Sequence, residues 1–272
     1  MGEILAVGLI RAGWNLDEIV MVARRPERAR EAERLTEIRT VLDPVAAIEG
    51  REVVIVAVKP KDVPDLLDQV GGAISPDQLV MSLAAGVPLA VFELALPGVP
   101  VIRSMPNTPA AVAEGMSAYC GGTEVDEEAF AKADAILAAV GETIRLSEDL
   151  LDAVTAISGS GPAYVFLLAE SLTEAAIREG LPHHAAEKLV DQMIRGAGIL
   201  LQGSEKSAFR LRGEVTSPGG TTAAAVHVLE DGGFRALMED AVRAAAHRSQ
   251  ALGEEAAANV AARHQAATEP GE

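Results

Sequence analysis

The segment VTSPGGTT, at residues 215–222, has the residue types best suited to hold a small anionic ligand. Ser217 and the Pro-Gly-Gly run after it predict a turn, and Thr221 and Thr222 then open an apolar helix. Backbone N–H groups at a helix start can bind a carboxylate, and a threonine hydroxyl can hydrogen-bond a ring nitrogen. An ordinary helix cap after a Pro-Gly turn has the same sequence, so the spacing alone leaves both interpretations open.

A second group of candidates follows apolar β-branched runs in the first half of the chain. Runs at residues 19–25, 52–60, 78–86 and 99–107 predict parallel strands buried on both faces. Open α/β sheets bind ligands at the carboxyl ends of such strands. Here those ends carry ARR (23–25), AVKP (57–60), AAG (84–86) and MPNTP (105–109), which together predict the lip of a ligand crevice.

The end of the 19–25 strand indicates which dinucleotide the crevice would take. An NAD site usually has Asp or Glu there for the ribose hydroxyls, whereas this chain has Arg24 and Arg25. Two guanidinium groups suit a 2′-phosphate, which favours NADP. A solvated basic loop is the alternative interpretation.

The elements that would position these residues change along the chain. Helices are predicted near 26–34, 62–70, 88–94 and 127–141, the last ending on Gly141. After about residue 148 the β-branched runs stop and helical spacing takes over. The predicted fold is α/β, a Rossmann-type doubly wound sheet followed by an all-α domain. Its parts are a dinucleotide-binding domain at 1–146, a helical domain at 147–253 and a flexible Ala-rich tail at 254–272.

The opening residues, MGEILAVGLIRAGW, predict the first helix of a nucleotide-binding βαβ unit, with Gly2 as the last glycine of its turn. The strand and the earlier glycines of such a unit do not precede it. Because that strand is central in a doubly wound sheet, its loss would open the middle of the sheet. We expect about 8–12 further residues upstream, with Met1 as an internal residue of the turn.

Composition excludes several classes of function. A net charge of −17 argues against non-specific binding to nucleic acid or to an anionic membrane. The one cysteine, Cys120, rules out an intrachain disulfide and is expected to be a small buried residue. The five histidines lack metal-ligand spacing, so no metal site is predicted. No signal peptide and no membrane span of ~18 uninterrupted apolar residues is found, which predicts a cytoplasmic protein.

Several motifs in order resemble those of one enzyme family. They are AVKP, SLAAGV, VIRSMPNTP, DAVTAISGSGPAYVF, VTSPGGTT and LEDGGFRALMEDAV. The chain resembles pyrroline-5-carboxylate reductase from Gly2 to about Gly253, and SGSGPAY with TSPGGTT is highly specific. The resemblance implies the last step of proline biosynthesis, reduction of 1-pyrroline-5-carboxylate. It also implies a helical domain that interlocks with a second subunit, and dimers that assemble further, often into decamers.

The resemblance further implies roles for individual residues. NADPH, with NADH as the alternative, would contact Gly2, Ala23, Arg24, Arg25, Ala57, Val58, Lys59, Pro60, Ala84, Ala85, Gly86 and Asn107. The substrate would contact Glu148, Val215, Ser217, Gly220, Thr221 and Thr222. The Thr222 hydroxyl would hydrogen-bond the imine nitrogen while the nicotinamide delivers hydride to the adjacent carbon. Because the iminium is already electrophilic, positioning supplies much of the catalysis and no strong base is needed.

Two further departures from the family pattern bear on binding. Pro44 stands where many members have Asn near the adenosine, and Glu214 replaces the Asn of NVTSPGG. The Glu214 carboxylate would either weaken binding of an anionic substrate or point away from it. Two alternative functions stay open: a related NADP-dependent imine or β-hydroxyacid reductase, and a non-catalytic dimerisation subunit.

Overall fold

The computed structural model describes residues 1–268, with side chains as far as residue 263. The chain forms two compact units. The first contains Met1–Ser160 together with the chain from Ala244 onward, and the second is Gly161–Arg243.

The first unit is built on two β-sheets. β3 (Val53–Val56), β4 (Leu79–Ser82) and β5 (Val101–Met105) run parallel, β6 (Gly115–Gly121) is antiparallel to β5, and β7 (Gly141–Arg145) is parallel to β6. β1 (Met21–Val22) and β2 (Thr40–Val41) form a separate two-stranded parallel sheet. The α/β class is therefore confirmed. The break between the two sheets lies between β1 and β3, where the sequence predicts that the sheet is open because its central strand does not precede α1.

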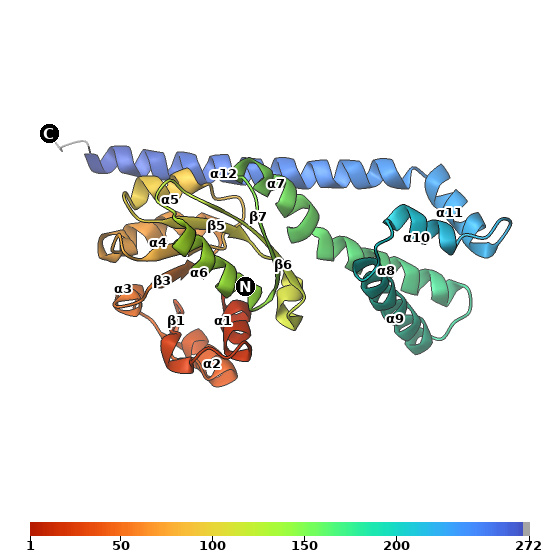
Figure 1. Cartoon of the computed structure of the whole chain (residues 1–272), viewed down its shortest axis with the longest axis horizontal. Helices are drawn as coiled ribbons and strands as arrows, with labels where there is room; N and C mark the ends of the chain where they lie inside the picture. The colour runs from red at the N-terminus through yellow and green to blue at the C-terminus, as the bar shows by residue number, and fades with distance from the viewer. Residues whose placement is uncertain (269–272) are drawn as a thin grey trace. The chain divides into compact units, whose positions relative to one another are not determined.

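Helices cover both faces of the five-stranded sheet because its central strands are apolar on both sides. Val80 packs in a cluster with α4 (Val63–Val70) and α5 (Leu89–Ala95), whereas its neighbour Met81 packs in a cluster with α1 (Gly2–Arg11) and α6 (Glu127–Ala138). Successive residues of a strand point to opposite faces, so one run feeds two cores. Figure 1 shows α4 and α5 on the side of the sheet along which the C-terminal helix runs.

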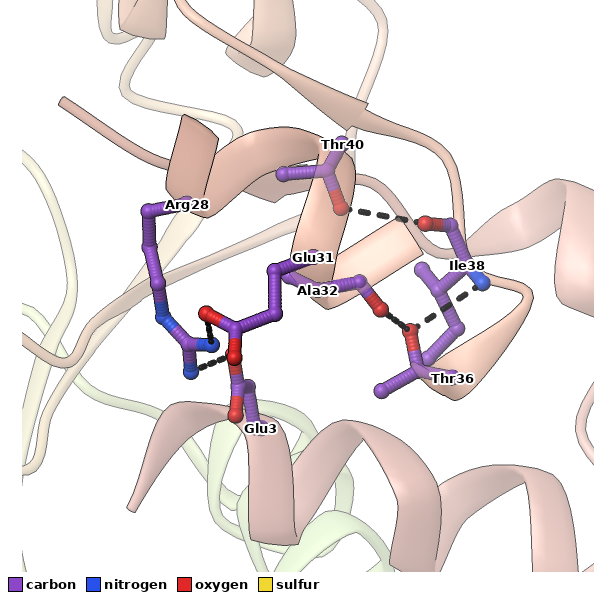
Figure 2. A network of polar contacts seen from close by, with 7 residues as sticks. All are labelled: Glu3, Arg28, Glu31, Ala32, Thr36, Ile38 and Thr40. Carbon is purple, nitrogen blue, oxygen red and sulfur yellow. Dashed lines mark hydrogen bonds and ion pairs between the residues drawn. The ribbon is translucent and has the colours of Figure 1, made fainter. Parts of the chain in front are cut away.

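The β1–β2 sheet is tied to α1 through α2 (Pro26–Thr36). Arg28 of α2 pairs with Glu3 of α1 and, at 2.8 Å, with Glu31 (Figure 2). These two carboxylates raise the pKa of the Arg28 guanidinium, mainly through the Glu31 hydrogen bond. At the other end of α2, Thr36 accepts a hydrogen bond from the Ile38 backbone N–H and donates one to Ala32, which shapes the turn into β2. α3 (Pro44–Ile48) follows β2.

The structure corrects some predicted elements. Strands form inside all four predicted runs but are shorter, and β2, β6 and β7 were not predicted. Gly141 does not cap α6; that helix ends at Ala138, and Gly141 begins β7 with φ +146°. A side chain on Gly141 would collide with the Gly115 backbone, so the glycine is required by strand pairing.

The domain limits also differ from those predicted. Residues 148–160, which form a 3-10 turn, α7 (Leu151–Val154) and a π-helical turn (Thr155–Gly159), belong to the first unit. So does the end of α12 (Phe234–Thr268), whose Ala256 and Val260 are buried in the α4–α5 cluster. Residues 254–268 are therefore helical rather than a flexible tail, because their alanines fit against an apolar surface. Residues 269–272 of that predicted tail lie outside the described residues.

The second unit is helical, as predicted. It contains α8 (Gly161–Arg178), α9 (His183–Gln202), α10 (Ala208–Glu214), α11 (Thr221–Asp231) and the start of α12. Within residues 161–243 only Ala186 and Val190 are buried apolar residues. Large apolar side chains are exposed instead, among them Phe166, Leu167, Leu189, Ile199, Leu200, Phe209, Val228 and Leu237.

Candidate functional site

Two of the predicted cofactor residues meet where α1 begins. A Cβ on Gly2 would lie 2.9 Å from the Ala57 Cβ, so the backbone of the first turn of α1 approaches the residue that follows β3. Residues 57–60 leave β3 with Ala57 and Lys59 exposed and Val58 and Pro60 half-buried. The start of α1 and the end of β3 thus share one edge of the sheet.

The candidate adenosine end contains an ion pair. Arg24, directly after β1 and Ala23, pairs with Asp62 at 3.2 Å between Nη2 and Oδ2. Asp62 belongs to the 3-10 turn Pro60–Asp62 that follows β3. Arg25 is exposed at the N-cap of α2 and makes no side-chain cap bond. Asp62 therefore neutralises one of the two guanidinium groups that favour a 2′-phosphate.

The turn after β4, residues 84–86, is held closely by its surroundings. The Ala84 N–H bonds the Ser82 hydroxyl at 3.2 Å, and Gly86 has φ +77°. A Cβ on Gly86 would lie 3.0 Å from the Ser249 carbonyl of α12. Ala85 is half-buried, whereas Ala84 and Gly86 are buried. A glycine is required at position 86 because its φ is positive and because α12 packs directly on it.

Asn107, the predicted cofactor residue after β5, is engaged within the protein. Its Nδ2 donates to the Ser158 carbonyl and to the Ser158 hydroxyl, each at 3.2 Å, and its Oδ1 accepts from the Met116 N–H at 2.9 Å. Asn107 thus ties the MPNTP loop to β6 and to the π-helical turn. The side-chain amide of Asn107 therefore stabilises the loop through hydrogen bonds within the protein.

The VTSPGGTT segment lies in the second unit and forms the turn predicted for it. Gly219 has φ +70°, and a Cβ on Gly220 would lie 2.5 Å from the Ser217 hydroxyl. Gly220 is the N-cap of α11 and has no side chain to satisfy the first N–H groups. Thr222 is half-buried, while Val215, Ser217 and Thr221 are exposed. The turn presents backbone N–H groups and the hydroxyls of Ser217, Thr221 and Thr222 on one short segment.

The structure also accounts for the two departures from the family pattern. The Glu214 carboxylate pairs with Lys206 Nζ at 2.8 Å, which offsets its negative charge beside the turn. Pro44 is the first residue of α3, where a missing N–H costs nothing, and Asp43 caps the helix through the Val45 N–H at 2.9 Å.

Glu148 lies in the first unit, in a polar cluster that the sequence does not reveal. Its Oε1 accepts from Arg103 Nη1 at 2.9 Å and from the Leu89 N–H at 2.7 Å. Arg103, in the middle of β5, is 6% exposed. The sequence does not predict this cluster. A charged residue such as Arg103 in an apolar run is usually interpreted as the point where a buried strand ends, not as a buried ion-pair partner.

The lone cysteine has no reactive environment. Burial, and then the charge of Glu148, raises the pKa of the Cys120 thiol to about 12. Within the part of the chain that the structure describes, no group of three or more His, Cys, Asp or Glu side chains could hold a metal ion.

Comparison with known proteins agrees with these features. The family described as pyrroline-5-carboxylate reductase dimerisation matches residues 148–252, and the family described as NADP oxidoreductase, coenzyme F420-dependent, matches residues 1–86. The pyrroline-5-carboxylate reductase of Mycobacterium tuberculosis is 40% identical over 93% of each chain. The chain belongs to the pyrroline-5-carboxylate reductase family. The reductase of Synechocystis is 41% identical over 93% of this chain and 95% of its own.

Solved structures of this family have the same fold. The pyrroline-5-carboxylate reductase of Coxiella burnetii is 35% identical, with a TM-score of 0.85 over 92% of this chain and 94% of its own. The pyrroline carboxylate reductase of Plasmodium falciparum, solved with NADP bound, is 28% identical with the same score over 93% and 94%.

Proposed function

We propose that this chain reduces 1-pyrroline-5-carboxylate to L-proline with a hydride from NADPH. The observation that carries the proposal is family membership at about 40% identity along 93% of the chain, which includes both the strand ends and VTSPGGTT. The fold and the comparisons agree on an oxidoreductase with a dinucleotide-binding first half.

The first unit fits a dinucleotide. The start of α1 approaches the end of β3 at Gly2 and Ala57, as the turn of a dinucleotide-binding unit requires, and Arg24 and Arg25 supply positive charge at the other end. We assign the 2′-phosphate to this pair, which favours NADPH over NADH. When bound, the nicotinamide would supply the hydride, and residues 84–86 would contact its ring.

The second unit supplies the groups for the substrate. Backbone N–H groups at the start of α11, with the Ser217 hydroxyl, would bind the carboxylate. The Thr222 hydroxyl would hydrogen-bond the ring nitrogen. With the ring nitrogen protonated, its neighbouring carbon accepts hydride without a base, so the chain's task is orientation.

The exposed apolar side chains indicate a second copy of the chain. A helical face with this much apolar surface requires burial, and the matched family is one of dimerisation. On the first unit, Ile144, Leu150 and Ile157 line a further apolar depression. We propose a homodimer that assembles further, up to a decamer.

One helical run, Glu148–Arg178, is long and apolar enough to cross a membrane by length and composition. We propose that partner helices rather than lipid cover it, because 3-10 and π turns interrupt its first third and the dimerisation family includes it. This corresponds to a cytoplasmic enzyme. Light scattering after detergent-free gel filtration should give a homo-oligomer; recovery only with detergent would contradict this.

The reaction itself is tested by incubating the purified chain with NADPH and 1-pyrroline-5-carboxylate. We expect loss of NADPH absorbance matched by formation of L-proline. A non-catalytic dimerisation subunit would bind no NADPH. A related imine or β-hydroxyacid reductase would oxidise NADPH with another substrate and make no proline.

A further inference from the structure

A polar network links the centre of the sheet to the C-terminal helix; Arg103 and Ser249 are buried in it, and its two carboxylates are half-buried. Arg103 bonds Glu148 at 2.9 Å and lies 3.6 Å from Asp152, and Asp152 accepts a 2.6 Å hydrogen bond from the Ser249 hydroxyl of α12. A buried guanidinium without partners would strongly destabilise the folded chain, so the Glu148 and Asp152 carboxylates are needed to compensate the charge of Arg103.

One end of this polar network contacts the turn at residues 84–86, and the other contacts the helix that follows the turn. Glu148 accepts from the N–H of Leu89, the first residue of α5, whose N-cap Pro88 offers no side-chain acceptor. Glu148 therefore caps the helix that the turn leads into. At the other end, the Ser249 carbonyl lies against Gly86, as a Cβ there would be 3.0 Å from it.

A third contact fixes the height of α12 above the turn. A Cβ on Gly253 would lie 2.5 Å from the Gly86 carbonyl oxygen, so the two backbones touch. Ser249 and Gly253 are one helical turn apart and share a face of α12. The Ser249–Asp152 hydrogen bond therefore fixes the rotation of α12 about its own axis, so that the face with Ser249 and Gly253 packs on Gly86.

We propose that Arg103, Glu148, Asp152 and Ser249 form a positioning network for the turn at residues 84–86. Glu148 then acts on the cofactor site through α5 and the turn. The inference rests on the proposed function, because it assumes that this turn contacts the nicotinamide. It deepens that function by giving a role to Arg103 and Asp152, which lie within the quoted motifs, and to Ser249, which lies outside them.

The test compares Ser249→Ala and Glu148→Gln with Glu127→Gln, a matched carboxylate in an exposed ion pair with Arg145. NADPH affinity is measured without substrate, and KM for 1-pyrroline-5-carboxylate and kcat separately. Both network variants should weaken NADPH binding about fivefold, the size expected for one lost hydrogen bond, and lower kcat. KM for 1-pyrroline-5-carboxylate should stay unchanged. Glu127→Gln should alter none of these values.

Other results would overturn the inference. A rise in the KM for 1-pyrroline-5-carboxylate with unchanged NADPH affinity in Glu148→Gln would make Glu148 a substrate ligand. A lower thermal midpoint with unchanged NADPH affinity and kcat in Ser249→Ala would make the network structural only. A wild-type chain that binds no NADPH would overturn the cofactor site and this inference together. Wild-type binding with unaffected variants would overturn the inference alone. Ser249→Ala keeps the test decisive if Glu148→Gln does not fold.

Discussion

Asp62 binds the guanidinium of Arg24 across the gap between the two sheets, with 3.2 Å between Oδ2 and Nη2. The pair joins the loop after β1 to the turn after β3. A 2′-phosphate at this point would compete with Asp62 for the same guanidinium group.

Replacing Asp62 with Asn should therefore improve the use of NADPH. The variant frees Arg24 and removes a negative charge, and an exposed pair of this kind is worth at most ~1 kcal/mol. We expect KM for NADPH to fall about two- to threefold and KM for NADH to stay the same. Arg24→Ala should raise KM for NADPH alone, with Arg34→Ala, on the exposed face of α2, as the control. Equal effects on both cofactors would place the phosphate elsewhere.

Substitution of Gly253 by Ala should destabilise the first unit. The added carbon would lie 2.5 Å from the Gly86 carbonyl, so the helix or the turn must move, at a cost of about 1–3 kcal/mol. The thermal midpoint and the NADPH affinity should both fall. Gly72→Ala is the matched control, because nothing lies within 4 Å of its new carbon. A tolerated Gly253→Ala would show that α12 does not press on the turn.

The Thr222 hydroxyl is tested by shape-conserving substitution. Thr222→Val keeps the branched side chain and removes the hydroxyl, so kcat should fall about tenfold with little change in NADPH affinity. Thr222→Ser keeps the hydroxyl and should retain most activity. Full activity in Thr222→Val would exclude the hydroxyl from the reaction.

Alkaline stability should depend on Cys120. Burial raises the pKa of its thiol to about 12 from the ordinary value of 9.0. Between these values the unfolded chain releases the proton and the folded chain keeps it, so the free energy of unfolding falls as pH rises through this window. Below pH 9.0 the thiol is neutral in both states and contributes nothing. Denaturant titrations should show a weaker alkaline loss in Cys120→Ala; an unchanged slope would contradict the buried neutral thiol.

The acidic balance of the chain predicts a response to salt. With a net charge of −17, repulsion between surface carboxylates opposes the compact state. Raising ionic strength shortens the reach of that repulsion, so the thermal midpoint should rise from low to physiological salt. A midpoint that falls over this range would show that the surface ion pairs outweigh the excess negative charge.

The sequence was sufficient for the fold class, the helical second half and the turn at VTSPGGTT. These depend on local patterns: strand periodicity, helical spacing and Pro-Gly-Gly geometry. It failed for β6, whose GMSAYCG has small and polar residues and only becomes a strand by pairing with β5. It also failed for residues 254–268, which the sequence predicts to be a flexible Ala-rich tail but which form a helix packed against the apolar α4–α5 cluster.

The polar network could not be predicted because its members are far apart in sequence. Arg103 and Ser249 are separated by most of the second half of the chain, and each is ordinary in its local context. Arg103 and Ser249 join one network only because α12 returns to the first unit, and no sequence motif predicts that return. The family resemblance named Glu148 as a substrate contact, but no pattern indicated its partner Arg103.

The break between the two sheets has a consequence for the local stability of β1 and β2. β1 and β2 share no backbone hydrogen bonds with β3. Side-chain ion pairs such as Arg28–Glu3 and Arg24–Asp62 therefore connect the β1–β2 sheet to the rest of the first unit. A ligand that spans from Arg24 to the turn at residues 84–86 would bridge both pieces. Amide exchange in β1 and β2 should then be faster than in β4 in the free protein, and NADPH should slow it more there than anywhere else.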